Sequence, residues 1–491
     1  MLKVWAFIIS VFWLLVCSCN SNEVSETEPP LPSNKTGEEL AKIHCGSCHV
    51  FPNPSALPKD IWIKGVLPKM ALRLGQGEYM NELMAYSNEE MMKIISARVY
   101  TETPIIAKED WLKIVAYYSK NAPEKLEVSK SLSKTELSGF DIKETTISSK
   151  EIVMTEFDSL RNELSISTTL NNGVYTLLPN GKIKDSSRTN SPVVATKYHK
   201  QLGKIVLEIG ILNPSELAQG RLLAGKRVLL DKLHRPVNFV LADINNDNFD
   251  DFVVANFGNL IGSLAWYDGK NLKETILLNE PGARVIHQVD FDKDGKKDFL
   301  VLMTQGREGI LFFKNIGNGT FESKTLLSFP SYFGSSYFEA KDLDKDGDID
   351  FIYTNGDNAD LSPIKKPFHG LRIYINDGKN SFTEKYFYPI NGASKVVSED
   401  FDKDGDLDFA VISFFPDEKN QEGFLYFQNQ GNFKFEVKSK KRVSNAKWLT
   451  LDTGDFDRDG DKDIILGAFN RDLRKKPQIK TVVILKNNIK K

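Results

Sequence analysis

The spacing of apolar residues changes character about a quarter of the way along the chain. Over residues 36–123, apolar positions recur three and four residues apart, as in KEDWLKIVAYYSKN, and this period is typical of amphipathic helices. Two residue pairs have the form of a capping box, which begins a helix: Thr36 with Glu39, and Ser87 with Glu90. We therefore expect residues 36–123 to form a small all-α domain of several short helices.

Short strand-like runs replace the helical pattern after a charged, serine-rich stretch. That stretch includes EKLEVSKSLSKTE, and we expect residues 124–136 to be a linker. From residue 137 onward, apolar runs alternate with Gly, Asn and Asp turns. The runs begin near residues 163, 204, 251, 298, 350, 408 and 463, which are steps of 41 to 58 residues. Such steps suit four-stranded blades, so we expect residues 137–491 to form an all-β propeller, seven-bladed by this count.

The last of these repeats lacks an outer strand, because the chain ends at TVVILKNNIKK. The segment GFDIKETTI, residues 139–147, has the pattern of the missing strand and is similar to GTFESKTLL at residues 319–327. We predict that this early segment completes the last blade and closes the ring. Six blades preceded by a decorated entry segment is the alternative.

Five of the repeats begin with an aspartate ladder, in which oxygen-bearing side chains stand at positions 1, 3, 5 and 9. Four of the five ladders have glycine at position 6, which permits a sharp turn. Calcium is a hard cation that binds several oxygen ligands, so we expect up to five calcium ions. The expected ligands are Asp243, Asn245, Asp247, Asp251, Asp290, Asp292, Asp294, Asp298, Asp342, Asp344, Asp346, Asp350, Asp400, Asp402, Asp404, Asp408, Asp455, Asp457, Asp459 and Asp463.

Two alternatives for the ladders are weaker. Helix–loop–helix calcium sites need a glutamate at position 12, whereas that position is apolar in every ladder here and a strand follows it. Asp and Gly also form turns without any metal. Five ladders in register would repel one another without a cation, and we therefore favour calcium loops.

Residues 45–49 read CGSCH, the attachment signature of c-type haem. The thiols of Cys45 and Cys48 would form thioethers with one haem, and His49 would bind the iron. A disulfide between the cysteines is an alternative in an exported protein. So is a zinc site, for which His44 is the nearest further ligand.

These patterns resemble known families. Residues 36–123 resemble a class I cytochrome c domain, and CHVFPNPSALPKDIWIKGVLPKM resembles cytochrome modules joined to repeat domains in Gram-negative lipoproteins. The resemblance implies His49 and Met70 as the axial ligands, although the short span between them keeps Met80 as an alternative. The ladders, together with ILFFKNIGNGTF, LRIYINDGKNSF and FLYFQNQGNFKF, resemble FG-GAP/VCBS repeats, which implies a propeller with calcium loops.

The N-terminus predicts export. Residues 1–18 place an apolar core after Lys3 and resemble a bacterial lipoprotein signal, in which Cys19 becomes the lipidated residue. Cys17 fits that role less well, and an ordinary cleaved signal is the alternative. Residues 19–35 are polar and contain proline, so we expect a flexible tether. The expected location is the outer membrane of a Gram-negative bacterium, on its periplasmic face or at the cell surface.

The expected function is electron transfer by a membrane-anchored c-type cytochrome, because Met/His ligation suits that role. The propeller would dock a redox partner protein or a polysaccharide. With a net charge of -2 and basic residues spread along the chain, nothing indicates a nucleic acid partner. A propeller-based oxidoreductase of the sugar or alcohol type and a surface adhesion or glycan-binding protein are the alternatives. No catalytic motif supports the first, since the propeller histidines fall in separate repeats: His199, His234, His287 and His369.

Overall fold

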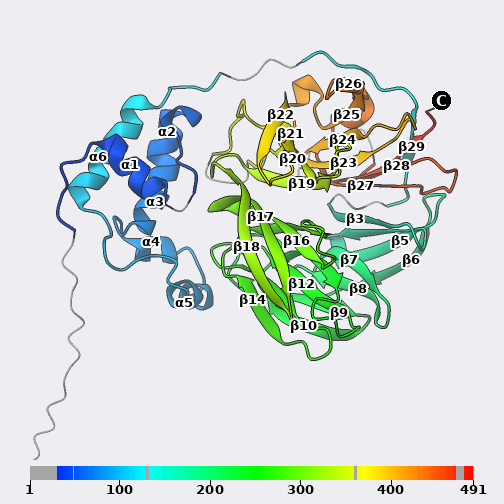
Figure 1. The fold of residues 1–491 in the computed structure, drawn as a ribbon, viewed down its shortest axis with the longest axis horizontal. Coiled ribbons are helices and arrows are strands. Elements are labelled where there is room, and N and C mark those ends of the chain that lie inside the picture. The colour runs from blue at the N-terminus through cyan, green and yellow to red at the C-terminus, as the bar shows by residue number, and fades with distance from the viewer. Residues whose placement is uncertain are drawn as a thin grey trace, which may run out of the picture.

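The computed structural model describes residues 30–47, 49–127, 132–147, 149, 151–358, 362–470 and 480–489. It contains a helical region, residues 37–121, and a ring of β-sheets (Figure 1). The predicted signal, Cys17, Cys19 and Cys48 lie outside the described residues. Within the described residues, no helix has both the length and the apolar character needed to cross a membrane.

The helical region consists of short helices, as the sequence predicts. Both capping boxes are present, with Thr36 before α1 and Ser87 before α5. The helices and single turns of this region are α1 (Gly37–Cys45), η1 (Pro54–Ala56), α2 (Lys59–Ile61), η2 (Trp62–Val66), α3 (Leu67–Arg73), α4 (Tyr79–Leu83), α5 (Asn88–Ser96) and α6 (Lys108–Asn121).

The first and last helices of this region, α1 and α6, pack closely against each other. A Cβ atom at residue 37 would lie 2.2 Å from the carbonyl oxygen of Lys113, so the close approach requires Gly37. A cluster of buried apolar side chains fills the space between the helices: Leu40, Ala41, Leu57, Trp62, Leu67, Ala71, Leu74, Ile106, Trp111, Ile114 and Tyr118.

The ring consists of seven antiparallel sheets, here called blades one to seven in chain order of their innermost strands. Blades one to three contain β3 (Ile152–Asp158), β4 (Glu163–Thr168), β5 (Gly173–Leu177), β6 (Ile183–Arg188); β7 (Val193–His199), β8 (Gly203–Glu208), β9 (Gly220–Ala224), β10 (Arg227–Leu233); and β11 (Pro236–Ala242), β12 (Asp251–Asn256), β13 (Ser263–Tyr267), β14 (Glu274–Leu278). Blades four and five contain β15 (Ala283–Val289), β16 (Asp298–Gln305), β17 (Arg307–Gly317), β18 (Thr320–Phe329); and β19 (Ser335–Lys341), β20 (Asp350–Asn355), β21 (Gly370–Asn376), β22 (Phe382–Pro389).

Blades six and seven complete the ring. They contain β23 (Ala393–Glu399), β24 (Asp408–Ser413), β25 (Phe424–Asn429), β26 (Phe435–Ser439); and β27 (Trp448–Gly454), β28 (Asp463–Ala468), β29 (Val482–Asn487). Short helical turns lie in connecting segments: η3 (Leu170–Asn172), η4 (Glu418–Asn420) and α7 (Lys441–Ser444). The innermost strand of each blade contacts that of the next around the whole ring. The predicted seven-bladed propeller is therefore confirmed.

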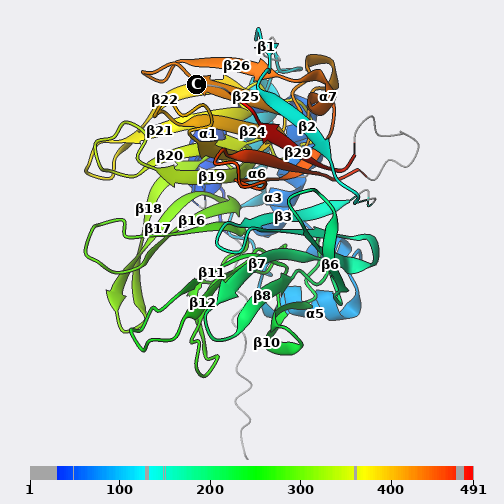
Figure 2. The ribbon, with the colours of Figure 1, turned by 90° about the vertical axis from the view of Figure 1, so that its right-hand side faces the viewer.

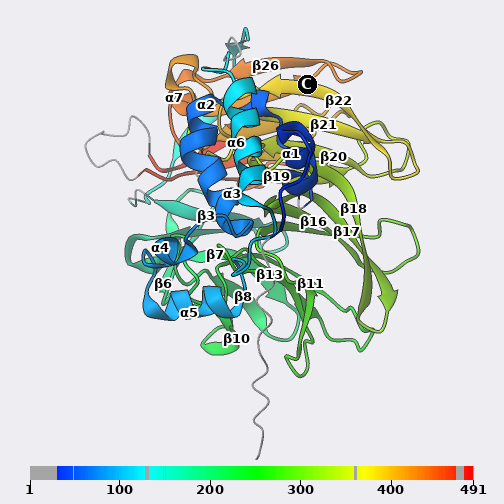
Figure 3. The same ribbon diagram turned by 90° about the vertical axis from the view of Figure 1, so that its left-hand side faces the viewer.

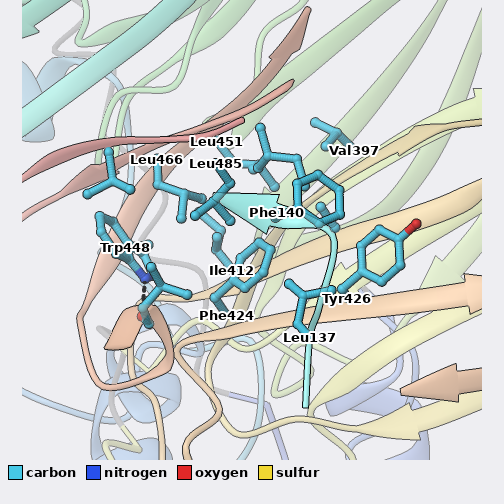
Figure 4. Close-up of a cluster of buried hydrophobic side chains, with 14 of the residues drawn as sticks. Leu137, Phe140, Val397, Ile412, Phe424, Tyr426, Trp448, Leu451, Leu466 and Leu485 are labelled. Carbon is cyan, nitrogen blue, oxygen red and sulfur yellow. Dashed lines mark hydrogen bonds between the residues drawn. The ribbon is translucent and has the colours of Figure 1, made fainter. Parts of the chain in front are cut away.

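The outer strand of blade seven comes from the N-terminal side of the propeller, as predicted. Strand β2 (Phe140–Glu144) pairs antiparallel with β29, in a register from Phe140 opposite Asn487 to Glu144 opposite Val483. Figure 4 shows Phe140 in the buried apolar cluster that blades six and seven share, near Tyr426. The six-bladed alternative is wrong, because β2 completes a seventh sheet. Just before it, β1 (Thr135–Glu136) adds a parallel strand to the edge of blade six.

The helical region lies against one face of the ring, as Figures 1 and 3 show. Val50 forms an isolated bridge with Pro330, and Tyr332 and Ile364 pack against the helical apolar cluster. These propeller residues lie in loops that join the second strand to the third or one blade to the next. The ladder loops join the first strand to the second and therefore leave the opposite ends of the strands. Figure 2 views the ring from the side away from the helices.

A second contact between the helices and the ring involves α5. The Glu90 carboxylate accepts hydrogen bonds from the Ser215 hydroxyl, at 2.6 Å, and from the backbone N–H of Glu216, at 3.1 Å. The bond from Ser215 is the largest reason why the pKa of Glu90 falls to about 2. One carboxylate thus caps α5 and contacts blade two.

Candidate metal and cofactor sites

Four of the five ladders bring three carboxylates together, with ligand oxygens all within 4.8 Å of one another. The groups are Asp290, Asp292 and Asp294; Asp342, Asp344 and Asp350; Asp400, Asp402 and Asp404; and Asp455, Asp457 and Asp459. Converging carboxylate oxygens are the donor set that calcium prefers. These four groups could therefore each hold a hard cation.

Each ladder loop is shaped by bonds from its own backbone to its carboxylates. In blade five, Gly347 has φ +91 and its N–H donates to Asp342 Oδ2 at 3.0 Å. The same bond, from position 6 to position 1, recurs in the other ladders. The turn brings the side chains at positions 1, 3 and 5 together in blades four, six and seven, and those at positions 1, 3 and 9 together in blade five.

The aspartate at position 9 is buried and has a structural part in every ladder. Asp350 accepts hydrogen bonds from the backbone N–H groups of Leu343, at 2.9 Å, and Asn376, at 2.8 Å, and so ties its loop to the third strand. Burial raises the pKa of Asp350 and Asp463 to about 6 and that of Asp408 to about 7. Among the expected ligands at position 9, only Asp350 belongs to a carboxylate group; Asp251, Asp298, Asp408 and Asp463 do not. Asp346, at position 5 of the blade-five ladder, is also outside its group.

The first ladder, in blade three, forms no group of three acidic side chains among the described residues. Asn245 Nδ2 donates to Asp268 Oδ2 at 3.1 Å, so the amide bonds to the neighbouring hairpin. Asp247 forms an ion pair with Lys270 at 3.2 Å. Asp243 accepts backbone N–H bonds from Asp247 and Asn248. The side chains of Asp243, Asn245 and Asp247 thus already form hydrogen bonds or an ion pair within the protein.

The side chain that faces each ladder from the third strand differs between blades, a feature that the loop sequences do not reveal. In blades four to seven it immediately precedes the asparagine whose N–H binds the position-9 aspartate. In blade four Lys314 pairs with Asp292 and lies 3.8 Å from Asp294. In blade seven Lys486 pairs with Asp457 and lies 3.1 Å from Asp459.

Blades five and six have no lysine at this position. Gln428 donates from Nε2 to Asp402 Oδ2 at 2.6 Å in blade six, and Ile375 occupies the position in blade five. Contact with the ladder carboxylates raises the pKa of both Lys314 and Lys486. At this third-strand position, blades four and seven therefore carry a lysine that pairs with the ladder carboxylates, whereas blades five and six carry an uncharged residue.

The first cysteine of CGSCH lies at the C-terminal end of α1. Its side chain is half-buried against the helical apolar cluster, as is that of Met70 on α3. Burial raises the pKa of the Cys45 thiol to about 11, so the thiol stays protonated at neutral pH. The segment that follows the motif is fixed by two buried donors: Tyr118 Oη to the Pro52 carbonyl at 2.6 Å, and Trp62 Nε1 to the Pro54 carbonyl at 2.8 Å.

The imidazole of His49 is oriented by its neighbour. Its Nδ1 lies 3.0 Å from the Val50 carbonyl oxygen. Because a carbonyl can only accept, this bond places the proton on Nδ1 and leaves the Nε2 lone pair for a metal, the usual arrangement of a histidine ligand. The expected haem would need such a lone pair on its iron. On α4, Met80 is 46% exposed, unlike the half-buried Met70. His44, the further ligand considered for zinc, lies on α1, and burial lowers its pKa.

The four propeller histidines lie in different parts of the ring. His199 and His287 are on the innermost strands β7 and β15, whereas His234 lies between β10 and β11 and His369 just before β21. His199 Nδ1 accepts from the backbone of Gln201 and Leu202. His199, His287 and His369 thus lie in separate blades, and His234 lies in the segment that joins blades two and three.

Comparison with solved structures gives low similarity. The N-terminal domain of Nup159 aligns with TM-score 0.41 and 12% identity, over 73% of this chain and 98% of that chain. The S. cerevisiae complex of Dbp5 with Nup159, Gle1, IP6 and ADP aligns with TM-score 0.42 and 10% identity, over 73% of this chain and 98% of that chain. The C-terminal WD40 domain of Sif2 aligns with TM-score 0.41 and 15% identity, over 68% of this chain and 81% of that chain. We draw no conclusion from TM-scores in this range.

Sequence comparison identifies the repeats. No characterised protein matches the chain. A family model described as an FG-GAP-like repeat matches residues 290–353, 342–411 and 400–466. The matches begin at the ladder of blade four and end in the second strand of blade seven. The chain therefore carries FG-GAP-like repeats, and they form part of a seven-bladed β-propeller.

Proposed function

We propose that this protein is an exported c-type cytochrome that transfers electrons and uses an FG-GAP propeller as its docking platform. One observation carries the proposal. The first thiol of CGSCH and the sulfur-bearing side chain of Met70 pack against the same apolar cluster, with the oriented imidazole of His49 following in the motif. Thiol, imidazole and thioether are the groups that a covalently held, six-coordinate haem requires.

The residues have distinct parts in this proposal. Cys45 and Cys48 would hold one haem covalently, and His49 and Met70 would bind its iron. The haem supplies a one-electron couple when bound. The chain contributes an apolar surround, a fixed tautomer of His49 through the Val50 carbonyl, and a thioether ligand that favours the reduced iron.

Calcium has a structural part in the proposal. Three converging carboxylates in each of four ladders repel one another, and a divalent ion between them removes that repulsion. The ions would stiffen the face of the propeller that lies opposite the helical region. The partners that we propose are a redox protein and a protein or polysaccharide ligand of the propeller, and the proposed location is the outer membrane through a lipid on Cys19.

The proposal is tested by visible spectra of the full-length protein, matured with the haem attachment machinery. The wild type should bind haem that survives denaturation, and Cys45→Ser with Cys48→Ser should abolish this. In the oxidised wild type we expect the weak red band that methionine ligation produces. Met70→Ala should remove the band, whereas Met80→Ala, at an exposed methionine, should leave it unchanged.

Other results would contradict specific parts. Loss of the red band in Met80→Ala alone would assign the sixth ligand to Met80. Binding of carbon monoxide by the reduced wild type would indicate an open iron and would favour an enzyme or sensor. Absence of covalent haem in the wild type would overturn the proposal.

A further inference from the structure

The turn that joins blade four to blade five lies against the helical region. It runs from Pro330 to Phe333 and is closed by a hydrogen bond from the Phe333 N–H to the Pro330 carbonyl, at 2.9 Å. Val50, the residue that follows CGSCH, forms a parallel bridge with Pro330. Figure 3 shows α1 and α6 over the blade-five strand β19, which begins just after this turn. The backbone that follows the haem motif is therefore tied to the propeller.

Two apolar side chains of the propeller extend the cluster that fills the helical region. Tyr332, in this turn, and Ile364, between β20 and β21, both pack against the cluster and are half-buried. Cys45 and Met70 pack against the same cluster from the helical side. Burial raises the pKa of Tyr332. The groups that would hold a haem and two groups of the propeller thus border one continuous apolar core.

Tyr118 on α6 has groups of both regions in its surroundings. Its side chain is fully buried, and its ring centre lies 4.6 Å from that of Trp62. Burial raises the pKa of Tyr118, and the groups that add to this rise include the Cys45 thiol and the Tyr332 phenol. The first cysteine of the motif and the propeller tyrosine therefore both lie close to the same buried hydroxyl.

The position of Tyr332 is fixed from within the propeller. Its ring centre lies 5.3 Å from that of Phe368 and 5.8 Å from that of Phe333. Phe333 and Phe368 stack on each other at 5.4 Å, and the Arg372 guanidinium lies 5.1 Å from the centre of the Phe333 ring. Arg372 is buried and forms an ion pair with Glu384 at 3.0 Å. Tyr332 is thus held by blade five independently of the helices.

We propose that the propeller supplies part of the haem site, through Tyr332 and Ile364, so that the reduction potential of the iron depends on residues outside the helical region. This inference rests on the proposed function, since it concerns the haem that CGSCH would hold. Oxidised haem iron carries one more positive charge than reduced iron, and an apolar surround disfavours the more highly charged state. Tyr332 and Ile364 would exclude water from their side of the cluster and would therefore raise the potential.

Redox titration of the full-length protein, matured with its haem, tests this proposal. Tyr332→Ala and Ile364→Ala should each lower the midpoint potential, because water then reaches the cluster. Tyr332→Phe keeps the aromatic ring and should keep the potential of the wild type. Tyr198→Ala is the matched control, since it removes a tyrosine of blade two that is 46% exposed, and it should leave the potential unchanged.

The proposal also predicts a result in the haem-free protein. When the full chain is made without the attachment machinery, Cys45 should react slowly with iodoacetamide, because its thiol is half-buried and burial raises its pKa to about 11. Tyr332→Ala and Ile364→Ala should each increase the rate of Cys45 alkylation, whereas Tyr198→Ala should not. Peptide mapping by mass spectrometry measures the rate at this cysteine alone.

The outcomes separate this inference from the proposed function. Covalent haem with the same potential in the wild type and in folded Tyr332→Ala and Ile364→Ala would overturn the inference alone. A rate of Cys45 alkylation that neither variant changes would overturn it as well, and a wild type without covalent haem would overturn both. The two residues lie in different loops, so a folding defect in one variant, identified by its melting curve, leaves the other as the test.

Discussion

The ladders of blades five and seven have nearly the same loop sequence and different electrostatic surroundings. DLDKDGDID and DFDRDGDKD make the same turn, with the same bond from the glycine N–H to the first carboxylate. The third strand then places Ile375 beside one ladder and the ammonium of Lys486 beside the other. The loop thus determines where the oxygens lie, but a residue on the next strand determines how much negative charge is left for a metal.

Removal of calcium should have the largest effect, and it should separate the two kinds of ladder. At free calcium about 100-fold above Kd, each occupied site adds about 2.7 kcal/mol to the free energy of unfolding, so two open ladders add about 5 kcal/mol. We expect titration calorimetry to detect tight sites in blades five and six only, and melting to occur earlier in a chelator. Four sites of equal affinity would mean that the lysines do not compete with calcium.

Loss of the buried aspartate at position 9 of a ladder should have the second-largest effect on stability, with or without calcium. Asp350→Ala leaves two buried backbone N–H groups without acceptors and should lower the free energy of unfolding by about 3 kcal/mol in a chelator. Asp344→Ala, on the exposed part of the same loop, should have little effect in chelator and should act only through calcium. Urea unfolding of both variants measures the difference. Equal losses of unfolding free energy would mean that Asp350 and Asp344 have the same role.

Exchanging the third-strand residue beside the ladder should reverse the difference in calcium affinity between blades five and seven. Ile375→Lys should weaken calcium binding in blade five at least about tenfold, or about 1.4 kcal/mol, because an ammonium then competes for the carboxylates. Lys486→Met should strengthen binding in blade seven by a similar factor. Calorimetric site counts in both variants check this, with Lys324→Met as a control for net charge. Unchanged counts would show that the loop alone sets the affinity.

The smallest effect is expected in blade three. Asp243→Asn should leave the number of calcium ions unchanged, since this ladder forms no acidic group and its side chains bond within the protein. Asp342→Asn is the matched change in blade five and should remove one ion. Loss of an ion in Asp243→Asn would place blade three among the open ladders.

Repetition explains how much of the fold the sequence could predict. Each ladder is followed by a strand that begins at its position 9, from Asp251 in blade three to Asp463 in blade seven, so a single pattern located five strands. The closing strand β2 was predictable because it resembles the outer strands of complete repeats. The capping boxes located α1 and α5 by the same kind of local signal.

The remaining features depend on residues that are far apart in the chain. Nothing in the loop sequence places Lys486 beside Asp459, and nothing near CGSCH indicates that Val50 meets Pro330. The choice between Met70 and Met80 depends on which helix faces the apolar cluster, and periodicity does not determine this for such short helices.

The closure of blade seven has a consequence for how the protein can be made. Phe140 pairs with Asn487, so the ring cannot close until almost the whole propeller has been synthesised. Contacts of such long range form late and slowly, and until then strand edges of blade seven are exposed. This arrangement would suit the export that we propose, because a ring that closes late stays unfolded longer.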